Sequence, residues 1–484
     1  MKQLKVYLIV ILALTIVIST AGCASDSMRS LGGYAGSGLP QPDGSTEFRA
    51  YEGPVMPLLT LDGAEGITAT RDTVFDFSGF RNISDGWMTR SDIKITDAYT
   101  LTNDTENDVA IKILYPFVSN FLQLNRFLPV ITSDGVPIET ELIAGTYSGG
   151  FSGDGDMMQA YNLERIRTWE GYSTLLSDGE YLRRALRGAQ ELGQIVTVYE
   201  LRNPRVENGR DAVAPTIAAH FKLDYDKTKI LAFGFNGTDR NVENGSMSKS
   251  FFVERRGYNY HIPNPYIVAV GDDISGLVIQ GYTDGSCSVK LDDVTADVVR
   301  YEMALGDVLA DILDVFLPAI HESFEANALF SQYIGEIPDA GMLYKAALEL
   351  LLDYGILSDD AAYRYVWGDV VGIFDDMIWV DRVFYLIADI EIPVGGSVAI
   401  NVDMTKPGSS TPPGFGTENA DIYGYEILTQ LGSDVEFRNV TAGIKGENYI
   451  QIVWQNFGFD LENGILTTTL DTEALRYYIE VRGR

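Results

Sequence analysis

The 484-residue sequence predicts an α+β protein built of antiparallel β-sandwich modules, with an inserted helical hairpin and a helical segment. Most of the chain alternates apolar and polar residues with a period of two, which is typical of half-buried strands. Two stretches, 156–192 and 297–378, change to helical spacing. Because strands and helices come in blocks, the pattern favours α+β over a parallel α/β sheet.

The first residues have the features of an export signal. Lys2 and Lys5 precede an almost wholly apolar run from Val6 to Ile18, and small residues then stand directly before Cys23. The apolar run is too short for a transmembrane span of about 20 residues. Small residues followed by Cys resemble the lipobox of bacterial lipoproteins. This resemblance implies that 1–22 is a signal peptide and that a lipidated Cys23 anchors the protein at the extracytoplasmic face of a bacterial membrane.

The sequence after the signal divides into four parts. Residues 23–53 are rich in Gly, Ser, Pro and Asp, which predicts a flexible tether. A β-rich domain is expected over 54–296, with the helical insert at 156–192. The helical segment of 297–378 follows, and a C-terminal β-rich domain is expected over 379–484.

The charge of the chain excludes some partners. The whole sequence has 36 basic and 68 acidic residues, and removing the two lysines of residues 1–22 gives a net charge of −34. Nucleic acid requires a basic footprint, so we expect no nucleic-acid partner. Attraction to anionic lipids is equally disfavoured, so the lipid on Cys23 must provide the membrane contact. Cys287 then has no disulfide partner, and we expect it to be packed in a strand over "DGSCSVKL".

Three hairpins are predicted from alternating strands that flank polar turns. The first covers residues 97–113 around "NDTEND", and the second covers 217–235 around "DYDKTK". The third surrounds Asp134-Gly135, a dipeptide that favours a two-residue hairpin turn.

The stretch from 97 to 142 resembles the N-terminal β-sandwich of VIT-type (vault and inter-alpha-trypsin) domains, and also a group of bacterial secreted proteins with the same layout. The matching positions are Asn103, Pro116, Phe117, Asp134, Gly135 and Ile138. This resemblance implies a sandwich and a role in protein interaction, and it implies no catalysis.

Three helices are predicted between 294 and 375. Apolar residues at helical spacing favour a helix from Val294 to Leu317, which Pro318 ends or kinks. Further helices are expected over 341–354 and 359–375. Strands return after residue 379.

Two short motifs begin like catalytic signatures but lack the partners that the chemistry needs. "HESFE", which starts at His321, has Glu325 where a zinc protease has its second histidine. "SMSK", from Ser246 to Lys249, matches the SxxK of penicillin-binding enzymes, but a strand-like stretch follows it. We therefore name no catalytic residue.

Acidic pairs offer the oxygen ligands that calcium prefers. They stand at Asp272-Asp273, Asp292-Asp293, Asp359-Asp360 and Asp375-Asp376. None follows the EF-hand spacing, and solvated turns or helix caps explain them. We predict no cofactor and keep calcium as the alternative.

Aromatic residues make up 11% of the chain and are concentrated in 364–380 and in "YIQIVWQNFGF", 449–459. Sugar-binding proteins place exposed aromatics beside carboxylates, whereas a β-rich core uses aromatics for packing. We favour packing for both stretches.

The sequence as a whole predicts a lipid-anchored surface protein that binds or scaffolds another envelope protein without catalysing a reaction. Two alternatives remain open. One is the solute-binding lipoprotein of a transporter, and the other is a cell-wall hydrolase whose carboxylates lie among the acidic pairs.

Overall fold

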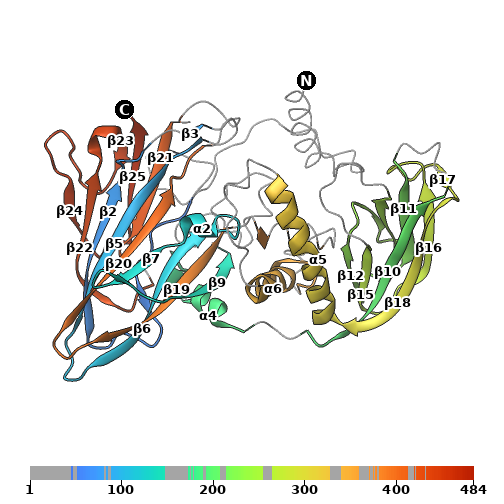
Figure 1. Cartoon of the computed structure of the whole chain (residues 1–484), viewed down its shortest axis with the longest axis horizontal. Helices are drawn as coiled ribbons and strands as arrows, with labels where there is room; N and C mark the ends of the chain where they lie inside the picture. The colour runs from blue at the N-terminus through green and yellow to red at the C-terminus, as the bar shows by residue number, and fades with distance from the viewer. Residues whose placement is uncertain are drawn as a thin grey trace. The chain divides into compact units, whose positions relative to one another are not determined.

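The computed structural model describes residues 45–46, 52–80, 83–84, 89–147, 173–174, 176–177, 179–188, 192–207, 214–253, 264–326, 340–358, 370, 374, 377–378, 381–411, 419, 421–430 and 432–484. Antiparallel sheets dominate these residues, as expected for a β-rich α+β protein (Figure 1). In this part of the chain, no helix has the length and apolar character needed to cross a membrane. The chain forms two compact units. The split unit holds residues 34–188, 332–342 and 378–484, and the central unit holds 189–331 and 343–377.

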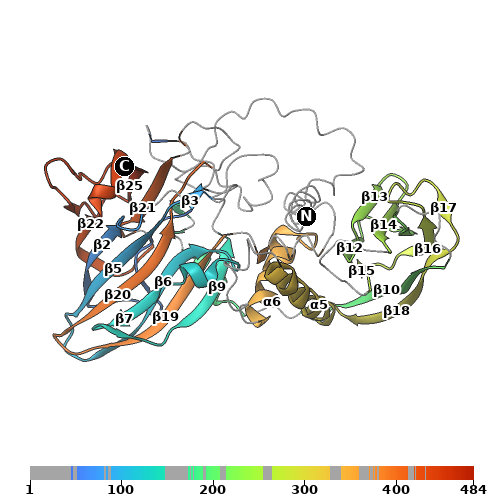
Figure 2. The same cartoon turned by 45° about the horizontal axis from the view of Figure 1, so that its top comes forward.

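A seven-stranded sheet forms one layer of the split unit. Its strands, in spatial order, are β24 (Thr467–Leu470), β22 (Glu436–Lys445), β2 (Ile67–Asp76), β5 (Asp92–Asn103), β20 (Ser397–Pro407), β7 (Val130–Ser133) and β8 (Val136–Pro137). Figure 2 labels five of them, β22, β2, β5, β20 and β7. The pairing of β2 with β22 is parallel, and the other pairings are antiparallel. Burial alternates along β5, so one face of the sheet packs in the core and the other faces solvent.

Two smaller sheets form the second layer. The first contains β1 (Leu59–Thr60), β6 (Val109–Ser119), β19 (Arg382–Ile392) and β9 (Glu141–Tyr147). The second, here called the C-terminal sheet, contains β21 (Ile422–Leu428), β25 (Arg476–Gly483) and β23 (Ile450–Gln455). Residues 55–60 connect them, because Val55 bridges to Ile427 and β1 pairs with β6.

Short elements complete the split unit. They are the strand pair β3 (Ile83–Ser84) and β4 (Thr89–Arg90), the helices α2 (Leu124–Phe127) and α4 (Glu180–Leu186), and the 3-10 turn Glu447–Tyr449. Helix α4 confirms a helix within the predicted insert at 156–192, and residues 151–172 lie outside the described residues.

The strand pairing joins segments that the sequence analysis placed in two domains. β19 pairs with β6 along its whole length, and β20 pairs with β5 in the same way. The strands of residues 379–484 therefore complete the sheets begun by residues 59–147. Sequence patterns show where strands lie but not which strands pair. The union of residues 59–147 and 379–484 in one unit could therefore not be predicted.

Two of the three predicted hairpins are wrong, although their strands are present. β5 and β6 lie in different layers, and the Tyr115 hydroxyl on β6 reaches across to donate to Asp97 on β5 at 3.1 Å. Residues 217–235 likewise supply β11 and β12 to different sheets. A polar turn between two alternating strands fits a crossing between layers as well as a hairpin. The third hairpin is confirmed: β7 pairs with β8 around Asp134-Gly135, whose φ angles of 49° and 80° suit that turn.

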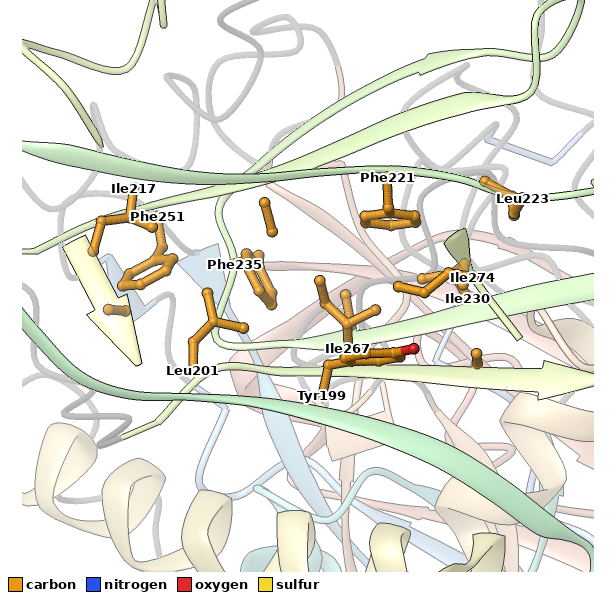
Figure 3. Close-up of a cluster of buried hydrophobic side chains, with 14 of the residues drawn as sticks. Tyr199, Leu201, Ile217, Phe221, Leu223, Ile230, Phe235, Phe251, Ile267 and Ile274 are labelled. Atoms are coloured by element: carbon orange, nitrogen blue, oxygen red, sulfur yellow. The ribbon is translucent and has the colours of Figure 1, made fainter. Parts of the chain in front are cut away.

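Two sheets form the central unit. The four-stranded sheet holds β12 (Thr228–Phe233), β15 (Tyr266–Gly271), β10 (Ile195–Val206) and β18 (Val294–Ala304). The five-stranded sheet holds β13 (Gly237–Asn241), β14 (Ser246–Phe252), β11 (Thr216–Lys222), β16 (Ser275–Tyr282) and β17 (Lys290–Leu291). Their facing side chains, among them Leu201, Ile217, Phe221 and Ile267, form a shared apolar core (Figure 3).

The helices of this region differ from the prediction at one end. Residues 294–304 are strand β18, and helix α5 (Leu305–Ala326) begins only after it, so the helix predicted from Val294 starts eleven residues too early. Val298 and Tyr301 are spaced as on a helix, but full pairing with β10 decides the conformation. Helix α5 continues past Pro318. The second predicted helix is confirmed as α6 (Ala340–Glu349) with the π-helical turn Leu350–Tyr354, and most of the third lies outside the described residues.

Candidate functional site: the outer face of the C-terminal sheet

Several residues from the sequence analysis lie outside the described part of the chain. These include Cys23, His261, and the acidic pairs at 359–360 and 375–376. His321 and Glu325 belong to helix α5, where only the backbone is described. Lipidation of Cys23 therefore remains a prediction.

The strand context that argued against an SxxK site in "SMSK" is confirmed. Ser246 and Lys249 stand on strand β14, where residues three apart point to opposite faces, and not on one face of a helix. Lys249 is buried and donates a hydrogen bond to the Thr238 hydroxyl at 2.8 Å. The serine and the lysine therefore cannot act on each other.

Cys287 lies in the turn between β16 and β17 and not in a strand as predicted. Its φ angle is 50°, it is half-exposed, and it forms no disulfide. On the same sheet, His220 is bonded to the Tyr282 hydroxyl at 2.8 Å. Burial lowers the pKa of His220, and Lys290 lowers it further.

In the Asp272-Asp273 pair, Asp273 serves as a structural partner. Asp273 receives hydrogen bonds from Tyr199 at 2.9 Å and Arg300 at 2.8 Å. Burial raises the pKa of Asp273, but these hydrogen bonds and the Arg300 charge outweigh burial and lower it. Within the described ranges, no three His, Cys, Asp or Glu side chains gather as a metal site would require. Calcium binding remains a prediction.

The polar turn at 103–108 is held by a buried asparagine. The Asn103 amide donates to the Asn107 carbonyl at 2.7 Å and to the Ile392 carbonyl at 3.0 Å. Its oxygen accepts from the Thr105 backbone amide at 2.9 Å. Asn103 therefore ties the β5–β6 connection to the β19–β20 connection, which is a structural role.

A buried ion pair stands at the centre of the split unit. Asp97 and Arg71 make two hydrogen bonds of 2.8 Å, and both side chains are fully buried. The carboxylate also accepts from the hydroxyls of Thr73, Tyr99 and Tyr115, at 2.7, 2.6 and 3.1 Å. Burial lowers the pKa of Arg71, but Asp97 and the two tyrosines more than reverse this effect. The group is enclosed and joins both layers, so we assign it to stability.

Two buried ionisable residues of the split unit hold the described part of the N-terminal segment. Glu480, on β25 of the C-terminal sheet, accepts hydrogen bonds from the Thr46 backbone amide at 2.6 Å and from the Thr46 hydroxyl at 2.8 Å. Lys406, on β20 of the seven-stranded sheet, donates to the Glu52 carbonyl, and the Glu52 amide donates to the Ser409 hydroxyl at 3.1 Å. Thr46 and Glu52, which belong to the predicted tether of 23–53, are thus fixed to the split unit.

Burial favours the uncharged form of both side chains and shifts the pKa of each accordingly. It lowers the pKa of Lys406 to about 8, while the carboxylates of Glu52, Asp381 and Glu426 limit the drop. It raises the pKa of Glu480 above its ordinary value, and the two hydrogen bonds from Thr46 oppose the rise.

Glu480 belongs to the outer face of the C-terminal sheet. The inner face is defined by Tyr423 and Tyr425, whose rings pack on Phe80 and Phe77 with centroid distances of 5.8 and 5.6 Å. Alternation then places the next residues of β21, and their partners on β25 and β23, on the opposite side. This second face, called outer only because it lies opposite Tyr423 and Tyr425, carries Gly424, Glu426, Trp454, Tyr478 and Glu480, and all of them except the partly exposed Trp454 are buried.

The register of the sheet sets the arrangement on this face. Glu480 lies between Gly424 on one neighbouring strand and Trp454 on the other. The Trp454 ring is partly exposed and lies 5.9 Å from the Tyr478 ring, centroid to centroid. Glu426 is paired with Arg476 at 3.4 Å. The face therefore combines one carboxylate that accepts a donor pair with a partly exposed indole.

Sequence reasoning found one part of this face. The prediction that aromatics of 449–459 serve packing is confirmed for Phe457 and Phe459, whose rings stack at 5.1 Å in the core. It is also confirmed for Trp454, which packs against Ile422 and Tyr478 on the other side of the sheet. The side of the sheet on which Trp454 lies could not be predicted from alternation, because the β-bulge between Ile452 and Trp454 shifts the pattern by one residue.

Comparisons of the chain with protein-family models, curated proteins and solved structures give no match. The function is therefore argued from the residues alone.

Proposed function

We propose that this chain is a lipid-anchored extracytoplasmic protein of a bacterial envelope that binds or scaffolds a partner without catalysing a reaction. The observation that carries the proposal is the contact of Thr46 with the buried Glu480, which fixes the chain that follows the lipobox-like Cys23 to the C-terminal sheet. An acyl chain on Cys23 would then hold the folded unit at a membrane surface, where it can meet other envelope proteins.

The position of Thr46 also supports attachment close to a membrane. Between Cys23 and Thr46 there are 23 residue steps, which span at most about 80 Å when fully extended. A Gly- and Ser-rich chain of that length has a root-mean-square reach of about 26 Å. A lipid on Cys23 would therefore keep the split unit at the membrane surface.

The anchor is tested with a cysteine substitution. In cells fed a clickable fatty acid, the wild-type chain should carry the label and sediment with membranes, and Cys23→Ser should lose both properties. Cys287→Ser is the matched control and should keep both. Membrane sedimentation of unlabelled Cys23→Ser at the wild-type level would remove the lipid from the proposal.

The binding role is tested by cross-linking on intact cells followed by mass spectrometry. Recovery of another envelope protein supports scaffolding. Recovery of a membrane permease would instead favour solute delivery. Turnover of a purified wall glycan or peptide by the wild-type protein would establish the hydrolase alternative.

A further inference from the structure

Three exposed asparagines among the described residues are each followed by glycine, at Asn236-Gly237, Asn244-Gly245 and Asn463-Gly464. A fourth pair, Asn208-Gly209, lies outside the described residues. In such a pair the glycine backbone nitrogen can attack the asparagine Cγ, because glycine has no Cβ to obstruct the approach. The new N–Cγ bond replaces the Cγ–Nδ2 bond, and the side-chain nitrogen leaves as ammonia with the proton from the glycine nitrogen. Water then opens the cyclic imide to aspartate or isoaspartate.

The surroundings of each asparagine decide how fast this step runs. The backbone must rotate until the glycine nitrogen reaches Cγ, so strand pairing of either residue opposes the reaction. Negative charge develops on the asparagine Oδ1 as the N–Cγ bond forms, so a hydrogen-bond donor at Oδ1 favours the reaction. A carboxylate beside the amide has the opposite effect, because it repels that charge.

Asn244 has favourable surroundings. It lies with Gly245 in the turn that the pairing of Asn241 with Ser246 closes, so neither residue of the pair belongs to the β13–β14 ladder. The Asn244 Oδ1 accepts from the Ser246 backbone amide at 2.9 Å, so a donor stands where the negative charge develops. The Gly245 nitrogen makes one long hydrogen bond, 3.4 Å to the Val242 carbonyl, which opposes its attack only weakly.

The other two pairs have opposing surroundings. Asn236 donates its backbone amide to the Ser250 carbonyl at 3.0 Å, and Gly237 pairs with Ser250 in the β13–β14 ladder, so rotation would break strand pairing. The Asn463 Nδ2 donates to the Asp460 carboxylate at 2.7 Å. Hydrogen bonds from Asn463 lower the pKa of Asp460, which is therefore ionised at neutral pH. This carboxylate restrains the amide and repels the developing charge.

We infer that Asn244 is a site of spontaneous deamidation in the folded protein, and that the fold protects Asn236 and Asn463. The inference goes beyond the proposed function and does not depend on the lipid anchor. It assigns a chemical modification to one of three dipeptides that are identical in sequence.

The modification would alter a contact between two turns of the central unit. Isoaspartate adds one carbon atom to the main chain directly before Gly245. The Gly245 carbonyl accepts from the Leu223 backbone amide at 2.9 Å, and the Ser246 carbonyl accepts from the Tyr225 hydroxyl at 2.8 Å. Hydrogen exchange of the Leu223 amide should therefore be at least about tenfold faster in modified molecules, which corresponds to the loss of one hydrogen bond.

The test compares each asparagine in the folded full chain with the same asparagine in the chain unfolded in guanidinium chloride. Both samples are incubated in the same mildly alkaline buffer, in water enriched in heavy oxygen, and peptide mass spectrometry follows the conversion of amide to acid. Asn244 should convert in the folded chain within about threefold of its unfolded rate, whereas Asn236 and Asn463 should be slowed at least about tenfold. Asp460→Ala should accelerate Asn463 at least about threefold and leave Asn244 unchanged. Circular dichroism verifies that the variant is folded.

Three results would overturn the inference. In the first, folding slows Asn244 about tenfold or more, as it slows the other two. In the second, Asn236 or Asn463 converts in the folded chain as fast as Asn244. In the third, the Leu223 amide exchanges equally in modified and unmodified molecules, which would remove the structural consequence.

Discussion

Replacing Asp97 by Ala should destabilise the split unit severely. The substitution removes the only carboxylate that contacts Arg71 among the described residues, and both side chains have zero exposure to solvent. Breaking a buried ion pair by removing one partner costs about 3–5 kcal/mol, because the remaining charge is left uncompensated. The hydroxyls of Thr73, Tyr99 and Tyr115 lose their acceptor at the same time.

These losses give an expected decrease of at least about 4 kcal/mol in the free energy of unfolding. Urea denaturation of the full chain, followed by tryptophan fluorescence and circular dichroism, measures the change. With a denaturant slope of about 1–3 kcal/mol per molar, the midpoint should fall by at least about 1 M. The same chain with Asp403→Ala is the control, because Asp403 is an exposed carboxylate that accepts a hydroxyl on the same sheet. It should change stability by less than about 0.5 kcal/mol.

A third variant separates the ion pair from the shape of the core. Arg71→Met with Asp97→Leu removes both charges, and replacing a buried pair by apolar residues is often close to neutral. We expect this double variant to be more stable than Asp97→Ala alone. Equal midpoints for Asp97→Ala and Asp403→Ala would refute the assignment of this ion pair to stability.

Three further predictions concern other sites. Because the pKa of Lys406 is lowered to about 8 in the folded chain, unfolding takes up a proton above that pH, so stability should rise from pH 8 toward 10.5, and Lys406→Met should flatten the rise in urea midpoints. Asn103→Ala should cost about 1–3 kcal/mol, seen as a lower melting temperature, since the buried Ile392 carbonyl and the partly buried Asn107 carbonyl lose their donor; an unchanged melting temperature would show that water replaces the amide. Gly281→Ala would place a methyl group 2.2 Å from the Val294 carbonyl oxygen and should unfold the central unit, whereas Gly193→Ala meets nothing within 4 Å and should melt like the wild type.

The local elements of this fold could be predicted from the sequence, but their partners could not. Period-two patterns located β2 and β5, along which buried and more exposed residues alternate. β19 was located as an almost continuous apolar run, because most of it is buried on both faces. The same patterns gave wrong hairpins over 97–113 and 217–235, since the turn residues do not encode whether the chain returns in the same sheet or crosses to the other layer. Pairing is decided by contacts between distant segments, such as the Arg71 hydrogen bond to the Thr429 carbonyl.

The candidate site was hidden for the same reason. Glu480 carries no local signal that distinguishes it from an exposed strand residue, and Trp454 lies 26 positions before it. Only the pairing of β23 with β25 brings them together, and the Thr46 that Glu480 holds lies more than 400 positions earlier in the chain.

The same long-range pairing constrains how the split unit can assemble. β2 pairs with β22, and β5 pairs with β20, which both come more than 290 residues later in the chain. The sheets begun by residues 59–147 therefore remain incomplete until residues 397–445 have joined them. The strands of the central unit lie within 195–304 and can pair without either end of the chain. Pairing of segments so far apart in the sequence is slow, because the entropy of closing the loop is lost before the new contacts stabilise the pair. The hydrogen bonds that fix Thr46 to β25 use the last strand described, so this contact forms only once the strands of the split unit have paired.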